Sequence, residues 1–116
     1  MFRNHKMKLQ PEAYDKIKAG TKVIESRLYD KKRHSISLGD SITFYRQPNS
    51  DESLTVRVVA LLRYPSFSAL IRDFPCAWFG GTGRGELLTQ LRQFYPEDDE
   101  KKYGVLGIKI QRIEKA

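Results

Sequence analysis

The segment GTKVIESR, residues 20–27, decides how this chain is organised, because it follows a short helical pattern and opens a strand. Side chains along a strand alternate between the two faces of a sheet. The face predicted to point into the core carries Ile24, Ser26 and Leu28. The face predicted to look out of the core carries Val23, Glu25, Arg27 and Tyr29. A carboxylate and a guanidinium are therefore expected side by side on one face of an otherwise apolar strand.

Two explanations fit these charges. A solvated ion pair between Glu25 and Arg27 would contribute little in water, about 0–1 kcal/mol. A functional cluster would use the same two side chains together with Lys22, which sits at the turn into the strand. Both explanations predict that Glu25 and Arg27 interact, directly or through water. An outward-facing Glu25 also predicts that Glu25→Gln leaves the fold intact.

The region before this segment reads as a strand or extended lead-in over residues 5–9 and a helix over residues 11–19. Pro11 suits the first turn of a helix, where its missing N–H is not needed. Gly20 follows the last helical residue, where a positive φ commonly ends a helix. The glycine is thus expected to stop the helix and turn the chain into the key strand.

The rest of the chain alternates strand and helix patterns. A basic connection contains Lys31, Lys32 and Arg33, and strands are predicted near residues 41–45 and 54–64, the longer one with a bend or bulge. Helices are predicted from Phe67, with Ser66 as the N-cap, and over residues 86–95, whose apolar stripe indicates a core face. The acidic run at 97–100 is typical of a helical turn, and residues 103–110 form a closing strand.

Composition favours one domain over residues 1–116 with a polyanionic partner, because 21 basic residues outweigh 14 acidic ones and give a net charge of +7. The single cysteine, Cys76, excludes an internal disulfide framework and a multi-cysteine metal site. The sequence has no apolar run of membrane-spanning length and no signal-peptide pattern near its start. We therefore expect a cytoplasmic protein without a membrane partner.

Two further stretches carry alternatives. Trp78 and Phe79 fit core packing, which aromatic residues most often provide, or a stacking surface for a base. The glycine-rich residues 80–85, which include Arg84, fit a mobile loop ahead of a helix or a backbone site for an anion. They lack the spacing of a dinucleotide or Walker motif.

The pattern G-x-K-x-x-E-x-R, formed by Gly20, Lys22, Glu25 and Arg27, resembles the signature of the ASCH domain family. The matching sequences LYD at 28–30, GD at 39–40 and YGVLGI at 103–108 extend the resemblance over about residues 7–113. The resemblance implies an α+β fold, a PUA-like mixed β-barrel of about five to six strands with two to three flanking helices. It also implies a cleft for RNA, a nucleotide or a nucleoside beside the motif, with no cofactor and no metal.

The resemblance leaves two functions open. In an RNA- or nucleotide-binding module, the expected contacts are Lys22, Glu25, Arg27, Tyr29, Lys31, Lys32, Arg33, Trp78 and Arg84. In a hydrolase acting on RNA or a modified nucleoside, Glu25 would be the general base and Lys22 would stabilise negative charge with Arg27. A strongly raised pKa of Glu25 would favour the hydrolase.

One branch of the resembling family hydrolyses 4-acetylcytidine with the motif lysine, a threonine three residues later and a distant glutamate. This chain keeps the lysine as Lys22 but has Glu25 at the threonine position. A carboxylate does not simply replace a hydroxyl nucleophile. The sequence therefore predicts that 4-acetylcytidine is at best a poor substrate.

Overall fold

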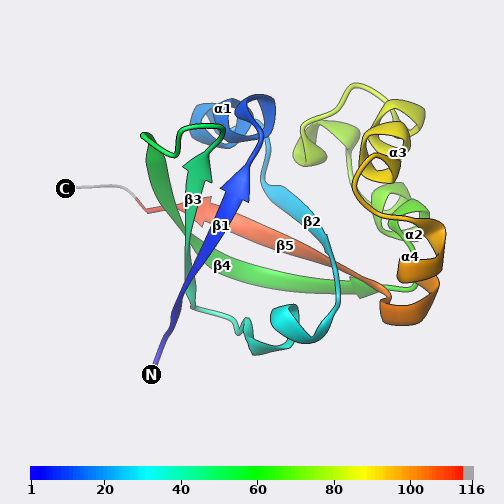
Figure 1. The fold of residues 1–116 in the computed structure, drawn as a ribbon, viewed down its shortest axis with the longest axis horizontal. Coiled ribbons are helices and arrows are strands. Elements are labelled where there is room, and N and C mark those ends of the chain that lie inside the picture. The colour runs from blue at the N-terminus through cyan, green and yellow to red at the C-terminus, as the bar shows by residue number, and fades with distance from the viewer. Residues whose placement is uncertain (114–116) are drawn as a thin grey trace.

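A single curled sheet of five strands, in the order β1-β3-β4-β5-β2, organises the computed structural model, which describes residues 1–113 (Figure 1). The strands are β1 (Asn4–Leu9), β2 (Ile24–Leu28), β3 (Ser41–Arg46), β4 (Ser53–Tyr64) and β5 (Val105–Arg112). β1 pairs with β3 in parallel, and the other three pairings are antiparallel. The sheet is a mixed half-barrel, and its two edge strands, β1 and β2, come toward each other across the open side. This confirms the predicted α+β, PUA-like architecture.

Within residues 1–113, four α-helices pack beside the sheet: α1 (Pro11–Ala19), α2 (Phe67–Arg72), α3 (Arg84–Arg92) and α4 (Glu97–Tyr103). Two short 3-10 helices, η1 (Lys31–Ser35) and η2 (Cys76–Phe79), complete the connections. In Figure 1, α1 covers one end of the sheet, and the other three helices gather beyond β2. The acidic run forms a full helix of its own, which explains why there is one more flanking helix than the sequence predicted.

The local predictions around the key segment are confirmed. α1 has the predicted bounds, and Gly20 follows it with φ +85°. Ser66 caps α2, because its hydroxyl accepts a hydrogen bond from the Ala69 N–H at 3.1 Å. The predicted irregularity in the long strand is a register shift between Val58 and Ala60.

Two hydrophobic clusters divide the core, and β2 lies between them. One fills the inside of the curled sheet, and the other packs the outside of β2 against α2 and α3. Ile24 and Leu28 belong to the helix-side cluster. Glu25 and Arg27 pair with Ile108 and Leu106 across the sheet, and these two partners belong to the inner cluster.

The predicted alternation along β2 is therefore correct, and Ile24, Ser26 and Leu28 are buried as predicted, but the expectation that the other face looks out of the core is wrong. Glu25 and Arg27 share the concave face of the half-barrel and do not look out of the core, and Glu25 is only 7% exposed. The physical reason is that β2 is covered on both faces, by helices on one side and by the barrel interior on the other. A strand with two covered faces gives a periodicity that does not tell which face is inner.

The prediction of one continuous helix over residues 86–95 is also wrong at its end. α3 ends at Arg92, and Phe94 is 58% exposed. Pro96 disfavours helical geometry at Tyr95, the residue before it, so the chain leaves the helix early. Phe94 is thus turned away from the core, whereas Tyr95 still packs on Phe67, with the two ring centres 5.3 Å apart.

Asp40 anchors the start of β1 to the turn before β3. Its carboxylate accepts hydrogen bonds from the backbone N–H of Arg3 at 3.0 Å and of Ser37 at 3.0 Å, and it lies 2.8 Å from the His5 ring. The His5 contact and these backbone bonds lower the pKa of Asp40 to about 2. Asp40 thereby fixes one end of an edge strand that borders the site described next.

Candidate functional site

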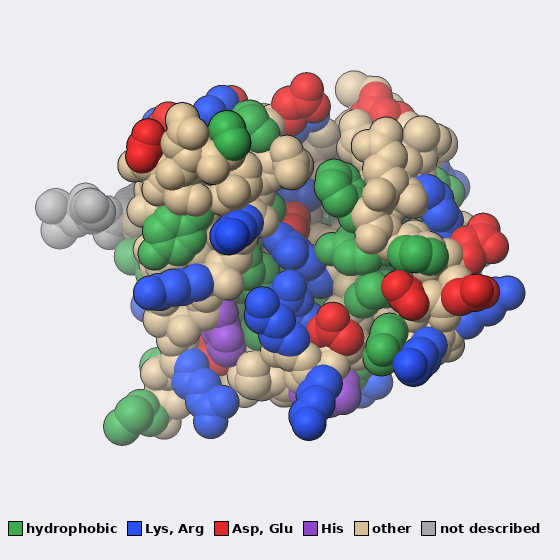
Figure 2. All heavy atoms as spheres, in the orientation of Figure 1, with side chains coloured by type: hydrophobic (Ala, Val, Ile, Leu, Met, Phe, Trp, Pro, Cys, Tyr) green, Lys and Arg blue, Asp and Glu red, His purple; other side chains and the backbone are tan. Residues whose placement is uncertain are grey.

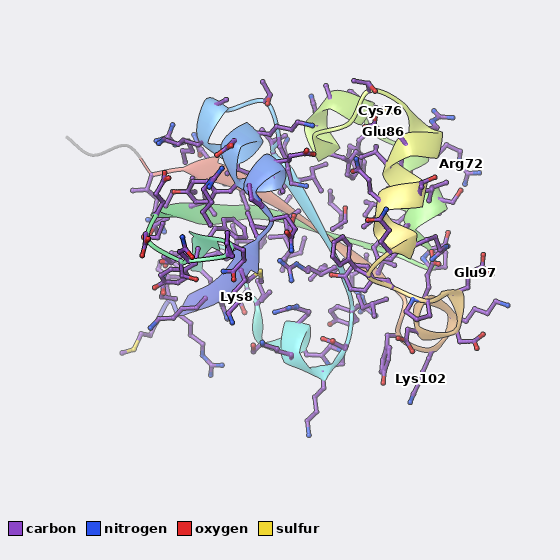
Figure 3. The ribbon with its side chains drawn as sticks, turned by 45° about the horizontal axis from the view of Figure 1, so that its top comes forward. Lys8, Arg72, Cys76, Glu86, Glu97 and Lys102 are labelled. Carbon is purple, nitrogen blue, oxygen red and sulfur yellow. The ribbon has the colours of Figure 1, made fainter. Side chains whose placement is uncertain are left out.

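The two edge strands of the half-barrel border a cleft of about 580 Å³, here called the seam cleft. β1 and its end contribute Lys8, Leu9 and Gln10, and β2 contributes Glu25, Ser26 and Arg27. The opposite wall comes from α3 and the segment after it. Figure 2 shows lysine and arginine side chains gathered over the hollow in the middle of this face. In Figure 3, β2 runs between Lys8 on β1 and the helix that carries Glu86.

At the bottom of the seam cleft lies a charged cluster made of Lys22, Glu25 and Arg27. The Glu25 carboxylate is 3.2 Å from Lys22 Nζ and 2.8 Å from Arg27 Nε. The three side chains are 10%, 9% and 15% exposed, in chain order. The predicted interaction between Glu25 and Arg27 is therefore confirmed, and it is a largely buried contact.

Arg27 also connects the two edge strands, because its Nη2 donates a hydrogen bond to the Lys8 carbonyl oxygen at 3.1 Å. The backbones of β1 and β2 are not neighbours in the order of the sheet. A side chain thus links the two edge strands where a closed barrel would continue its backbone ladder. The guanidinium is thus held by Glu25 on β2 and by the Lys8 carbonyl oxygen on β1, and it lines the seam cleft.

The end of η2 and the first residue of the glycine-rich loop position Lys22. Lys22 Nζ donates a hydrogen bond to the Phe79 carbonyl oxygen at 3.1 Å, and Lys16 Nζ donates one to the Gly80 carbonyl oxygen at 2.5 Å. Gly80 has φ +86°, and a Cβ there would lie 3.1 Å from Lys22 Cδ. The carbonyl groups at the start of this loop thus face lysines, and glycine at 80 leaves the room that both lysine stems need.

The electrostatics of the charged cluster keep Glu25 ionised. Burial alone would raise the pKa of Glu25, but the positive charges of Lys22 and Arg27 outweigh it and lower this pKa below its usual value. For Arg27, burial is again the largest influence and would lower the pKa, yet Glu25 raises it overall. Two cations and one carboxylate leave the cluster with one net positive charge.

The other predicted contacts lie around the seam cleft in different ways. Partial burial, and then repulsion from Arg27, lower the pKa of Arg33, so this residue is electrostatically coupled to the cluster. Lys31 and Lys32 are exposed on η1. Arg84 is exposed, and its Nη2 lies 3.4 Å from the Arg72 carbonyl oxygen.

The two predicted stacking residues lie outside the seam cleft. Trp78 packs against Phe74 in the helix-side cluster, and the Lys109 ammonium lies 4.8 Å from the Trp78 ring centre. The Tyr29 ring contacts Arg63, with the guanidinium carbon 4.0 Å from the ring centre. Trp78 thus follows the core-packing alternative, and Tyr29 lines a second groove described below.

Sequence reasoning missed the aromatic wall of the seam cleft. Phe94 and Tyr95 line it, whereas the sequence predicts both on the core face of a longer helix, which is correct for Tyr95 because it also packs on Phe67. The proline after them was the available signal, because it shortens α3. Sequence reasoning also missed four glutamines, Gln10, Gln47, Gln90 and Gln93, which line the cleft and follow no recognisable pattern.

Comparisons with known proteins match the fold. A family model described as ASCH domain matches residues 7–114. The hypothetical protein PH0355 is 39% identical, with a TM-score of 0.84 over 95% of this chain and 99% of that one. Protein PF0455 from Pyrococcus furiosus is 38% identical, with a TM-score of 0.76 over 97% and 99% of the two chains. An ASCH protein from Zymomonas mobilis shares the fold at 14% identity, with a TM-score of 0.68 over 93% and 66%.

The search of curated proteins gave no match. Within residues 1–113, no three His, Cys, Asp or Glu side chains come close enough together to hold a metal ion. None of the helices in this described part is long and apolar enough to cross a bilayer.

Proposed function

The chain belongs to the ASCH domain family, which is generally linked to RNA binding, and we propose that it binds RNA or a nucleotide in the seam cleft. The observation that carries the proposal is the buried charged cluster of Lys22, Glu25 and Arg27 at the bottom of this cleft. A cluster with a net positive charge, held by hydrogen bonds on two sides, is prepared to receive a phosphate. Charge-assisted contacts of this kind are among the stronger hydrogen bonds in proteins.

Arg27 is the proposed main phosphate contact. A guanidinium has five N–H donors. Among the described contacts, Nε donates to Glu25 and Nη2 donates to the Lys8 carbonyl oxygen. The guanidinium also shares a side-chain hydrogen bond with Tyr95, and the donors beyond these three contacts can reach a ligand oxygen. Lys8 lines the same cleft from an exposed position on β1 and adds a second positive charge.

The aromatic wall is the proposed contact for a base. Phe94 is 58% exposed although it lines the cleft, so its ring can be covered by a planar ligand. Stacking on aromatic side chains is a common way of binding unpaired bases in RNA. The glutamines around the cleft each carry both donors and acceptors, which suit the polar edge of a base. The volume of about 580 Å³ lies in the range of small-ligand sites.

The charge state of Glu25 favours binding over hydrolysis by a glutamate base. An efficient general base has a pKa near the working pH. Lys22 and Arg27 instead lower the pKa of Glu25. In the proposed function Glu25 therefore holds the two cations in place and is not a proton acceptor in a reaction.

A titration of fluorescein-labelled hexauridylate, followed by anisotropy at low salt, tests this proposal. We expect Arg27→Gln to weaken binding at least tenfold, because it removes a charged hydrogen-bonding group. We expect Phe94→Ala to weaken it several-fold through lost stacking. Arg57→Gln is the matched control, since it removes one charge from an exposed site on β4. Melting curves identify any variant that has lost its fold.

An absence of binding by the unmodified protein at low salt would overturn the proposal. Equal losses for Arg57→Gln and Arg27→Gln would also overturn it, because the effect would then come from net charge and not from the seam cleft.

A further inference from the structure

A second hollow, of about 370 Å³, lies where β4 ends and β5 begins, just beyond the end of β2. Three tyrosines, Tyr29, Tyr64 and Tyr103, line it together with Arg63. We call it the tyrosine groove. The proposed function above does not involve the tyrosine groove, so its aromatic side chains and guanidinium need a separate explanation.

The tyrosine groove contains a guanidinium held against a ring. The Arg63 guanidinium carbon is 4.0 Å from the centre of the Tyr29 ring, and the centre of the His34 ring is 4.2 Å from it. Two groups so close to one ring centre must occupy its opposite faces. Tyr29 is therefore covered, and it serves to hold Arg63, which is exposed. The planar guanidinium is thus prepared to stack on a further planar group.

Two other rings complete the tyrosine groove. Tyr103 is 38% exposed and stands at the end of α4. Tyr64 is fixed by the hydrogen bond that its hydroxyl donates to Asp73 at 2.7 Å. The groove thus combines an exposed ring with an arginine plane, and both kinds of group stack on bases in RNA complexes.

The tyrosine groove adjoins the seam cleft along one strand edge. Arg27 in the cleft and Tyr29 in the groove are two residues apart, which is roughly 7 Å along an extended chain, and they share one face. η1 (Lys31–Ser35), the basic turn, is close to both sites. Its Arg33 is electrostatically coupled to Arg27, and its His34 contacts the Tyr29 ring.

We propose that the tyrosine groove is a second base-binding subsite, so that the ligand is a single-stranded RNA of at least two nucleotides. This inference rests on the proposed function. One nucleotide occupies the seam cleft, the sugar-phosphate backbone passes the basic turn, and a following base stacks on Arg63 and Tyr103. A cationic path between two stacking sites is the usual arrangement for binding unpaired strands.

The test compares a mononucleotide, uridine monophosphate, with labelled hexauridylate at the same low salt. The variants are Arg63→Gln and Tyr103→Ala in the groove and Phe94→Ala in the seam cleft. Arg57→Gln is the charge-matched control on the same strand as Arg63. Competition against the labelled hexamer gives the affinity of the mononucleotide.

We expect each groove variant to weaken hexauridylate binding about five- to tenfold, because one stacking contact is lost, and to leave the affinity for the mononucleotide unchanged. We expect Phe94→Ala to weaken binding of both ligands. Arg57→Gln should change neither by more than about twofold.

Other results would overturn the inference in distinguishable ways. If the groove variants bind hexauridylate as well as the unmodified protein while Phe94→Ala weakens it, the groove is not a subsite and the proposed function stands. If the groove variants weaken both ligands equally, the groove is not a separate second subsite. If neither ligand binds the unmodified protein, the inference and the proposed function both fail.

Discussion

The charged cluster and the basic turn lie next to each other in the chain and use similar residues in opposite ways. In the cluster, Lys22 and Arg27 are mostly buried and share one carboxylate. In the turn, Lys31 and Lys32 are exposed, with no acidic residue in its first helical turn. The cluster therefore holds its side chains in fixed positions through their ion pairs with Glu25. The turn instead contributes a positive electrostatic potential that is weakened by salt. Basic residues thus support a built site where a carboxylate pairs with them and a charged surface where none does.

The largest expected effect is on the charged cluster. Glu25→Gln leaves Lys22 and Arg27 buried beside each other without a compensating charge. Removing one partner of a buried ion pair costs about 3–5 kcal/mol, so we expect a loss near the lower end of this range because glutamine keeps the shape. This revises the sequence-based prediction that the fold tolerates the change. Urea unfolding of the unmodified protein and of Glu25→Gln measures the loss of unfolding free energy. A loss under about 1 kcal/mol would contradict the description of a buried cluster.

Acid should affect the same cluster with a defined sign. The pKa of Glu25 is lowered from its usual 4.5 in the folded protein, so its contribution to stability is complete above that value. The contribution is then lost as the pH falls through the lower, folded-state pKa. We expect the difference in unfolding free energy between the unmodified protein and Glu25→Gln to shrink progressively below about pH 4.5. A difference that stays constant down to pH 2 would exclude Glu25 as the source of the pH dependence.

A second carboxylate provides a smaller effect with a purely structural cause. Asp40→Ala removes the acceptor for the backbone N–H groups of Arg3 and Ser37. We expect a loss of about 1–3 kcal/mol, as is typical when backbone donors are left without a partner. The pKa of Asp40, about 2 against a usual 3.8, predicts that this contribution is complete above pH 3.8 and lost toward pH 2. Thermal unfolding at pH 7 and pH 2.5 checks both statements, and an equal loss at both values would contradict them.

Substitutions in the basic turn should affect RNA binding more than stability, whereas Glu25→Gln in the charged cluster should mainly lower stability. We expect charge reversal at Lys31, Lys32 and Arg33 to weaken hexauridylate binding about tenfold at low salt, because long-range attraction to phosphate is lost. Lys31 and Lys32 are exposed, and exposed surface substitutions usually change stability by less than about 0.5 kcal/mol, so a variant reversed at these two residues alone serves for the comparison of binding with stability and leaves out the partly buried Arg33. Anisotropy and urea unfolding on the same variant separate the two effects. A large loss of stability with unchanged binding would invalidate the contrast between turn and cluster.

The smallest effect is expected in an assay for hydrolysis. We expect no measurable acetate release from 4-acetylcytidine above the uncatalysed rate. Attack by Glu25 on the amide would give a high-energy anhydride. The lowered pKa of Glu25 also makes this carboxylate a weak base for activating water. Turnover of roughly 1 per second or faster that disappears in Glu25→Gln would contradict this and favour the hydrolase alternative.

The sequence was sufficient for the parts of the fold that depend on local rules. α1, Gly20, the cap at Ser66 and the irregularity in β4 follow from proline, glycine, serine and β-branched residues acting over a few positions. The contact between Glu25 and Arg27 also followed from the alternation along one strand.

The missing parts depend on contacts between distant segments. The inward direction of Glu25 and Arg27 requires knowledge that helices cover the other face of β2. The cleft wall formed by Phe94 and Tyr95 depends on where α3 ends relative to β1. The positions of Trp78 and Tyr29 outside the cleft were likewise set by tertiary partners, Phe74 in one case and Arg63 in the other. Local periodicity carries no information on any of these contacts.

The salt dependence of hexauridylate binding, measured for the unmodified protein and Arg27→Gln, tests the central claim most directly. Each phosphate contact contributes a slope of about −0.7 to the plot of log affinity against log salt concentration. We expect linear plots for both proteins, with the slope for Arg27→Gln shallower by about 0.7 and its affinity lower at every salt concentration. Identical slopes and affinities for the two proteins, or no binding at the lowest salt, would contradict the claim that the charged cluster at the bottom of the seam cleft binds RNA.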